Sequence, residues 1–405
     1  MIQPTDTGKQ LREHHAQTLW MYWTLVVLGC WMLLMPTTFS YHKGLTEINE
    51  TRNLWLDLPS RISALEWSDR ISGLLLIFFG FRSVRPNHPV SLWVCCLVGV
   101  WLNAAPLVFW SPVPLVYAND TLVGVLVISF SVLTPGMPNM TAYMKMGAEV
   151  PSGWSYNPSS WDQRWVMIVL GFAGWMVSRY LGAWQLGFID KAWDPFFGDG
   201  TRKVLNSAMS RSWPISDGAL GAFAYTFEFL MGWMGGPARW RTMPWMVTFF
   251  GILVIPLGLV HIFLVMSQPV AVGSWCTFCL LAATIMLPML PLEVDEVIAA
   301  GILGVVLLFA PGFWHIRIDT MAAHIFHISG ALVVVCSVIS MAEVVRVVRY
   351  ANWPAGLAVA ILPWFFHGGL APGLTGAVCG TLICIFSISR GRIHETYGFW
   401  QRYIR

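Results

Sequence analysis

The chain has 405 residues, of which 56% are hydrophobic and only 11% are charged, and its mean hydropathy is +0.61. Globular domains carry about 25% charged residues, so this composition excludes an ordinary soluble protein and indicates a polytopic membrane protein. The net charge of +3 is too small to indicate binding to nucleic acid.

Apolar runs long enough to cross a membrane predict an all-α polytopic membrane protein with about twelve transmembrane helices. The runs lie at residues 18–38, 67–83, 91–109, 120–137, 164–184, 217–236, 243–266, 275–292, 294–313, 322–345, 354–369 and 372–389. The basic segment before the first run precedes an apolar stretch long enough to span, so we expect a membrane helix there and no cleavable signal peptide.

Lysine and arginine are enriched in the short loops and tails on one side of these spans. That side holds Lys9, Arg12, Arg82, Arg85, Lys145, Arg239, Arg241, Arg346, Arg349, Arg390, Arg392, Arg402 and Arg405. The positive-inside rule therefore predicts that both termini are cytoplasmic. We expect a multi-pass protein of the bacterial inner membrane.

The two ends of the chain resemble each other. RISGLLL at 70–76 matches HISGALV at 327–333, and further glycines and prolines on either side match in the same order. The matched pairs are Gly29 with Gly304, Pro36 with Pro311, Gly99 with Gly356, Pro106 with Pro363, and Gly124 with Gly380. We predict that a four-helix module at 1–140 is duplicated at 293–405, in the same orientation.

The N-terminal copy contains FWSPVP at 109–114, with Trp110, Ser111 and Pro112 at an expected outer helix end. This short motif resembles the SPW-repeat family of bacterial membrane domains. The resemblance implies no chemistry, so we expect both copies to be helical scaffolds.

Residues 160–292 match neither copy and form a central module with a long outer loop at 185–217. The apolar run KVLNSAM in this loop predicts a short interfacial helix. Four loop aromatics either cap a cavity or lie among lipid headgroups: Trp193, Phe196, Phe197 and Trp213.

Cys276 and Cys279 open the last helix of the central module, within GSWCTFCLLAA. Two intervening residues place both sulfurs on one helical turn, where they can form a disulfide, and a helix N-terminus stabilises a thiolate. The outer end of the helix faces the oxidising side of the membrane. We expect Cys276 to lie nearer the water and to exchange with a partner thiol, and Cys279 to face a lipid-soluble electron acceptor.

Three stretches of this module resemble the vitamin K epoxide reductase family, four-helix membrane thiol oxidoreductases that use quinones. WCTFC at 275–279 is similar to the family's active-site pair, and GALGAFAYTFEFLMG at 218–232 resembles its second helix. TRKVLNS at 201–207 resembles a family loop that reads Cys-x-Lys-Val-Leu-x-Ser. The resemblance implies a four-helix redox bundle that exchanges electrons between an extracytoplasmic thioredoxin-like or other thiol protein and ubiquinone or menaquinone.

The resemblance also implies roles for single residues. Cys276 and Cys279 would be catalytic, and the quinone would be bound by Ser207, Asp217 and Tyr225. Thr201, however, stands where the family has a loop cysteine, and no cysteine lies between positions 97 and 275. Either a partner therefore reacts directly with the helix pair, or the module is a non-catalytic scaffold or accessory subunit that binds quinone, lipid or protein, for example within a larger membrane complex.

Two further side chains could move protons. Glu228 lies near the middle of the 217–236 span, where a carboxylate is costly and suggests function. His261, nearer the outer end of the 243–266 span, could act with it as a general acid. The alternatives are a protonated Glu228 that bonds a neighbouring helix, and a histidine that only packs.

A metal site competes for the cysteine pair. His324 and His327 lie at i, i+3 at the same expected membrane level, and two cysteines with two histidines could hold zinc or copper. Inert structural thiols are the third alternative. We favour the redox dithiol and expect no metal.

Overall fold

The computed structural model describes residues 4–48, 54–86, 88–133, 150, 152–157, 159–243, 246, 260–261, 263–286, 297–314, 316, 320–340, 343–366, 369–388 and 395–396. The first half of the described chain holds α1 (Pro4–Thr38), α2 (Leu58–Ser83), α3 (Pro89–Val108), α4 (Pro114–Ile128), η1 (Ser129–Leu133), α6 (Trp161–Gln185), α7 (Gly200–Leu205) and α8 (Ala208–Arg211). The second half holds α9 (Asp217–Trp233), α10 (Arg239–Thr242), η2 (Gln268–Val272), α12 (Thr277–Met286), α13 (Val297–Phe313), α14 (Met321–Ile339), η4 (Glu343–Ala351), α15 (Asn352–Phe365) and α16 (Leu370–Phe386). The described elements include no β-strand, so the predicted all-α fold is confirmed.

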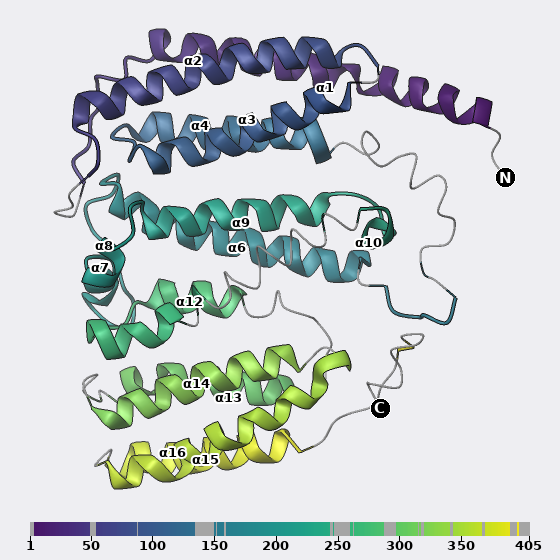
Figure 1. The fold of residues 1–405 in the computed structure, drawn as a ribbon. Helices are drawn as coiled ribbons and strands as arrows, with labels where there is room; N and C mark the ends of the chain where they lie inside the picture. The colour runs from purple at the N-terminus through teal and green to yellow at the C-terminus, as the bar shows by residue number, and fades with distance from the viewer. Residues whose placement is uncertain are drawn as a thin grey trace.

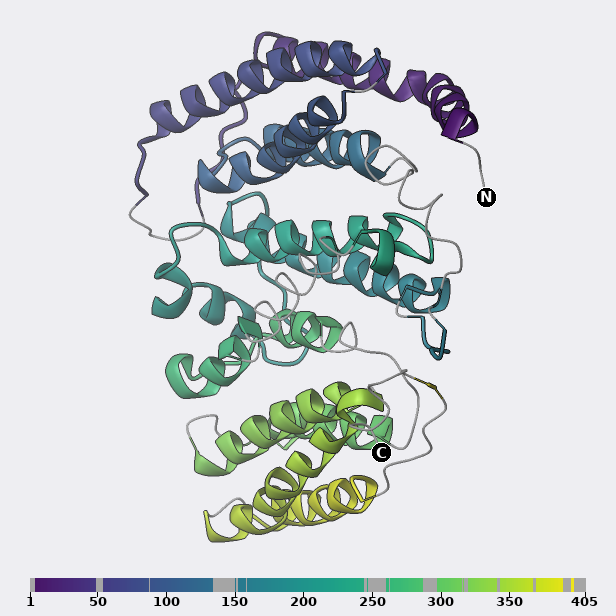
Figure 2. The same cartoon turned by 45° about the vertical axis from the view of Figure 1, so that its right-hand side comes forward.

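The helices form antiparallel pairs that stack along one axis of the molecule (Figure 1). In chain order the pairs are α1 with α2, α3 with α4, α6 with α9, α13 with α14, and α15 with α16. A second view shows the same order, with α12 between the α6–α9 and α13–α14 pairs (Figure 2). The short helices α7 and α8 lie beside the middle of the stack, on the side away from the N-terminus (Figure 1), so the central module carries its long loop on that side.

Four described helices are long and apolar enough to cross a membrane: Arg12–Thr38, Pro89–Val108, Pro114–Leu133 and Trp161–Gln185. Shorter apolar helices follow at Phe263–Val272, Thr277–Met286, Met321–Ser337 and Leu370–Phe386. The span predicted at 243–266 lies largely outside the described residues. These helices and the composition are those of a membrane protein.

Helix α2 begins nine residues before the predicted span at 67–83, and its early turns include the buried charged residue Arg61. Arg61 Nε donates to the carbonyl oxygen of Phe109 at 3.1 Å. Hydropathy cannot predict that a charged side chain is buried when it donates hydrogen bonds to the carbonyl oxygens at the end of a neighbouring helix.

Glycines make the helix crossings at both ends of the chain. A Cβ on Gly29 would lie 2.8 Å from the carbonyl oxygen of Gly73, and one on Gly304 would lie 2.9 Å from that of Gly330. The same holds for α3 with α4, where Gly99 meets Gly124, and for α15 with α16, where Gly356 meets Gly380. The α1–α2 crossing thus corresponds to the α13–α14 crossing, and the α3–α4 crossing to the α15–α16 crossing. This correspondence supports the duplication that we propose for 1–140 and 293–405.

Trp110 of the FWSPVP motif connects the N-terminal helices to the central module. Its backbone has a φ of 47°, in the left-handed region that non-glycine residues seldom adopt. Arg61 donates to its carbonyl oxygen, and its own indole donates to the carbonyl oxygen of Pro214 at 2.9 Å. The motif therefore holds the end of α3 against the loop that leads into α9.

Candidate redox site

Cys276 and Cys279 form a disulfide at the start of α12, with their Cα atoms 5.3 Å apart. Cys276 occupies the N-cap position, since its carbonyl oxygen accepts from the amide of Leu280 at 3.0 Å. Its Sγ accepts from the amide of Cys279 at 3.1 Å. A thiolate on Cys276 would therefore be stabilised by a helix N-terminus.

The two sulfurs have different surroundings. Cys276 is 0% exposed, whereas Cys279 is only partly buried. Cys276 is therefore covered rather than open, and its expected place nearer the water stays a prediction. The loop between α6 and α9 folds over this residue, and the sequence pattern of a single helix cannot reveal such a cover.

Asp194 holds the covering loop, residues 194–201, which we call the lid. Its carboxylate accepts from the amide of Thr201 at 3.1 Å and from the Thr201 hydroxyl at 2.7 Å. It also accepts from the amide of Thr277 at 3.1 Å, from the Thr277 hydroxyl, and from the amides of Phe196 and Phe197 at 3.1 and 2.9 Å. Burial raises the pKa of this carboxyl, but the hydrogen bonds outweigh burial and hold the pKa below its ordinary value. One ionised side chain thus fastens the lid to the first turn of α12.

Thr201 places its hydroxyl oxygen 3.6 Å from Cys276 Sγ. A hydroxyl has one proton, and the shorter contact to Asp194 takes it, so Thr201 covers the sulfur while donating mainly to Asp194. Beside it, a Cβ on Gly200 would lie 1.8 Å from the carbonyl oxygen of Trp275. The lid can pack this closely only because Gly200 has no side chain.

Aromatic side chains join the lid to the C-terminal helices. The rings of Phe196 and Phe313 lie 6.5 Å apart, and Phe197 packs between Trp275 and the backbone of Gly312. These two loop phenylalanines therefore seal the lid against α13.

The alternative of a metal site at Cys276, Cys279, His324 and His327 is not supported by the geometry. Among the described residues, no three His, Cys, Asp or Glu side chains lie close enough to hold a metal. The ring of His327 instead packs on the indole of Trp275, with 3.3 Å between centroids. The indole therefore occupies the place beside His327 that a shared metal would need.

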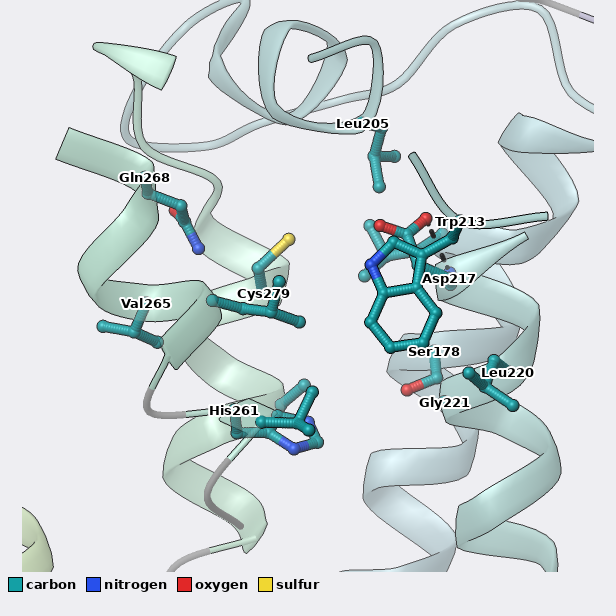
Figure 3. Close-up of a pocket in the computed structure, with 15 residues that line it drawn as sticks. Ser178, Leu205, Trp213, Asp217, Leu220, Gly221, His261, Val265, Gln268 and Cys279 are labelled. Atoms are coloured by element: carbon teal, nitrogen blue, oxygen red, sulfur yellow. Dashed lines mark hydrogen bonds between the residues drawn. The ribbon is translucent and has the colours of Figure 1, made fainter. Parts of the chain in front are cut away.

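A partly open cavity of about 100 Å³ lies beside Cys279 (Figure 3). The Cys279 sulfur points into it from α12, and Trp213 and Asp217 line the opposite wall. Gln268 and His261 lie on the same side as the cysteine, above and below it in this view. The remaining lining is mostly aliphatic, including Leu181, Leu205, Leu220, Leu264 and Val265.

Asp217 is held in place by a buried glutamine. Gln185 Nε2 donates to Asp217 Oδ1, which also accepts from the hydroxyl of Ser210 at 3.1 Å. The Gln185 carbonyl oxygen accepts from Ser216 Oγ at 2.6 Å and from the amide of Gly218 at 3.0 Å. This network fixes the first turn of α9 and sets the carboxylate at the cavity wall.

Residues 165–294 match the model of the vitamin K epoxide reductase family. The chain contains a vitamin K epoxide reductase family domain. No curated protein and no solved structure matches the chain. The domain indicates a membrane thiol–disulfide oxidoreductase-like role in general, and it spans the lid, the cysteine pair and the cavity.

Two residues that the resemblance assigns to quinone binding do not line the cavity of this domain. Ser207 is the N-cap of α8, where its hydroxyl accepts from the amide of Ser210 at 3.3 Å. Tyr225 is buried, and its hydroxyl donates to the carbonyl oxygen of Ala282 at 2.8 Å. Both hydroxyls already serve the fold, and their role in quinone binding stays a prediction.

The two candidate proton carriers of the domain lie in different places. His261 lines the cavity, and its ring centroid is 6.1 Å from that of Tyr225. Glu228 is 0% exposed, and within the described part of the chain neither of its carboxyl oxygens has a hydrogen-bond partner. The relay between them stays a prediction.

Three residues of the domain escaped the sequence analysis. Asp194 and Gln185 bond partners far along the chain, and Gln268 accepts from the amide of Cys276 at 2.8 Å through its side-chain oxygen. Of the three, only Asp194 has a sequence feature that indicates a hydrogen-bonding role: it precedes a proline in a loop rich in residues that cap helices and form turns.

Proposed function

We propose that this protein is a membrane thiol–disulfide oxidoreductase that exchanges electrons between a thiol protein on the outer face and a membrane quinone, through Cys276 and Cys279. The observation that carries the proposal is the placement of Cys279, whose sulfur faces a largely apolar cavity while its disulfide partner is covered by the lid. Such a pair meets a lipid-soluble acceptor on one side and an aqueous partner on the other.

The cavity residues suit the ring end of a quinone. About 100 Å³ is less than the roughly 300 Å³ of typical ligand pockets, so the ring would enter and the isoprenoid tail would remain among the lipids. Near the sulfur, His261 and Gln268 carry N–H groups that could donate to a quinone oxygen. Asp217 can only accept unless it is protonated.

The electron balance involves two thiols and one disulfide. Oxidation of the reduced pair closes the Cys276–Cys279 bond and releases two electrons and two protons, which together convert a quinone to a quinol. A partner dithiol restores the pair: its thiolate forms a mixed disulfide, its second thiol resolves that bond, and the partner leaves as a disulfide. The same steps run in reverse when quinol is the electron donor.

The lid determines how the partner reaches Cys276. A hydroxyl cannot exchange disulfides, so Thr201 cannot pass electrons as a loop cysteine would. We propose that the partner displaces the lid, which requires Thr201 and Thr277 to leave Asp194. Because Asp194 is already saturated with donors, it acts as a positioning residue and would be a weak base.

Turnover in membranes tests the proposal. Membranes that contain the protein should form quinol when dithiothreitol and a short-chain quinone are supplied, and Cys276→Ser and Cys279→Ser should each abolish this activity. Cys30→Ser, which changes a cysteine of α1 outside the domain, is the matched control and should leave the rate unchanged. Quinol formation that survives both active-pair substitutions would disprove the proposal.

The covered Cys276 favours one second candidate, a non-catalytic subunit that keeps the fold. Under that alternative Thr201 and Asp194 lock the pair permanently as a structural disulfide. Dithiothreitol would then fail to reduce the pair in the folded protein, and the substitutions that open the lid would not produce activity.

A further inference from the structure

Two carboxyl groups face each other inside the N-terminal helices, outside the family domain. Asp69 belongs to α2 and Asp120 to α4, and both are 0% exposed. Tyr41, in the turn after α1, is also buried and donates its hydroxyl proton to Asp69 Oδ2. The carboxyl of Asp120 accepts from Asn119 Nδ2 at 3.2 Å through Oδ1.

Each carboxyl group has one further oxygen, at a level where α2 and α4 meet: Leu65 and Val116, one turn before the two acids, pack in one cluster with Tyr41. Among the described residues, no protein donor reaches Asp69 Oδ1 or Asp120 Oδ2. Each carboxyl group acts electrostatically on the other, and one proton held between them would give both oxygens a partner. Two buried carboxylates in contact cannot both be ionised, as the shared proton of aspartic-protease pairs illustrates.

The second copy of the repeat shows which residues are sufficient to pack these helices at the positions of Tyr41, Asp69 and Asp120. At the matching positions it has Ile316 for Tyr41, Phe326 for Asp69 and Gly376 for Asp120. Phe326 is fully buried, Ile316 packs in the same cluster, and a Cβ on Gly376 would lie 3.4 Å from the Phe326 ring. The same architecture therefore packs with an apolar contact where the first copy holds two acids.

This difference argues that the acids serve something other than the fold. Burying carboxyl groups is costly, and replacing buried polar groups by apolar ones of similar size is often neutral or stabilising. A site that only had to pack would tolerate the apolar solution of the second copy.

A chain of titratable groups leads from the pair to the outer surface. Glu66 lies one turn before Asp69 in α2 and contacts Arg70 and His42, each at 3.6 Å. The side chain of His42 is 69% exposed. Tyr41, Glu66 and Arg70 are the titratable and charged groups that act on the pair, and His42 contacts Glu66, whereas α3 carries no charged residue.

We propose that Asp69 and Asp120 form a proton-binding site that holds one proton between their carboxyl groups and exchanges it with the outer surface through Tyr41, Glu66 and His42. This proposal does not depend on the redox function of the central domain.

Infrared spectroscopy of the purified full-length protein tests the site. At neutral pH the wild type should show a protonated-carboxyl C=O band that shifts in D₂O, and the Asp69→Asn/Asp120→Asn variant should lack it. The variant Tyr41→Ile/Asp69→Phe/Asp120→Gly, which copies the second repeat, should also lack the band and should unfold at the same temperature as the wild type or higher. A difference spectrum without this band would show that both acids are ionised and would overturn the proposal.

Two further measurements ask whether the bound ligand is a proton or Na⁺, and whether the proton reaches the surface through Glu66 and His42. Sodium chloride added at constant pH should leave the band unchanged, and loss of the band would identify Na⁺ as the ligand instead. Glu66→Gln and His42→Ala should retain the band but slow its shift in D₂O severalfold. An unchanged rate in both variants would overturn the route through these side chains.

Discussion

The surroundings of Cys276 and of Cys279 differ although the two residues share one helical turn. Cys276 is sealed by Thr201, Gly200 and the donors that Asp194 gathers, whereas Cys279 opens on an apolar cavity. The comparison teaches that reactivity at this pair is set by the loop and not by the spacing of the cysteines. One side can remain open to a small lipid-soluble molecule while the other is protected from unspecific thiols.

The largest expected effect is on thiol accessibility. In the reduced protein, N-ethylmaleimide should modify Cys279 about 100-fold faster than Cys276, which corresponds to a local opening free energy of about 3 kcal/mol for the lid. Peptide mass spectrometry resolves the two sites. Equal rates would show that the lid does not protect Cys276.

Thr201→Cys should change the disulfide connectivity. The new thiol would stand close to Cys276 Sγ and attack the Cys276–Cys279 bond, forming a disulfide with Cys276 and freeing Cys279 as a thiol. Non-reducing peptide mapping detects the exchange. Thr201→Ser is the matched control, and a variant whose Cys276–Cys279 bond persists would contradict the geometry of the lid.

Asp194→Asn should open the lid. The amide accepts through one uncharged oxygen where the carboxylate used two, and each hydrogen bond to a charged group contributes about 1.5–3 kcal/mol. Labelling of Cys276 should rise about tenfold or more, by the same conversion of free energy to rate. Asp199→Asn removes a carboxylate that only pairs with Arg202 on the surface, and it should have no effect.

The lid should also loosen in acid. The pKa of Asp194 is lower in the folded protein than its ordinary value, so its stabilisation is complete above the unfolded-state pKa of about 4. The stabilisation is then lost as the pH falls through the folded pKa. Hydrogen exchange of peptides covering 194–201, corrected for intrinsic rates, should accelerate in that range in the wild type and much less in Asp194→Asn.

The smallest effect is expected at Ser207. Ser207→Ala removes an N-cap hydrogen bond, which costs about 1 kcal/mol at most for so short a helix, and it should leave the rate of quinol formation within about twofold. A loss of quinone binding with unchanged stability would instead support the role that the family resemblance implies and would place Ser207 in the site.

The helices and the position of the cysteine pair were predictable because both depend on local patterns. Apolar runs located most spans, and a cysteine pair that follows glycine and serine marked a helix start. Helix α2 begins earlier than predicted, and Arg61 in its early turns is buried against the end of α3. No hydropathy value contains that information.

The surroundings of the site were not predictable, since they depend on contacts between distant segments. Asp194 bonds Thr277 across 83 positions of the chain, and Thr201 reaches Cys276 across 75. The resemblance showed correctly that a loop cysteine is absent at position 201. Only the structure shows that the threonine there covers the disulfide.

The central claim is that the Cys276–Cys279 pair is oxidised by quinone from the cavity side. The most direct measurement reduces the purified protein, removes the reductant, adds a short-chain quinone in excess, and determines the state of the pair by mass spectrometry while quinol is quantified. The account predicts that the disulfide closes and that one quinol appears for each pair, with none from Cys279→Ser. A pair that remains as two thiols in excess quinone would contradict it.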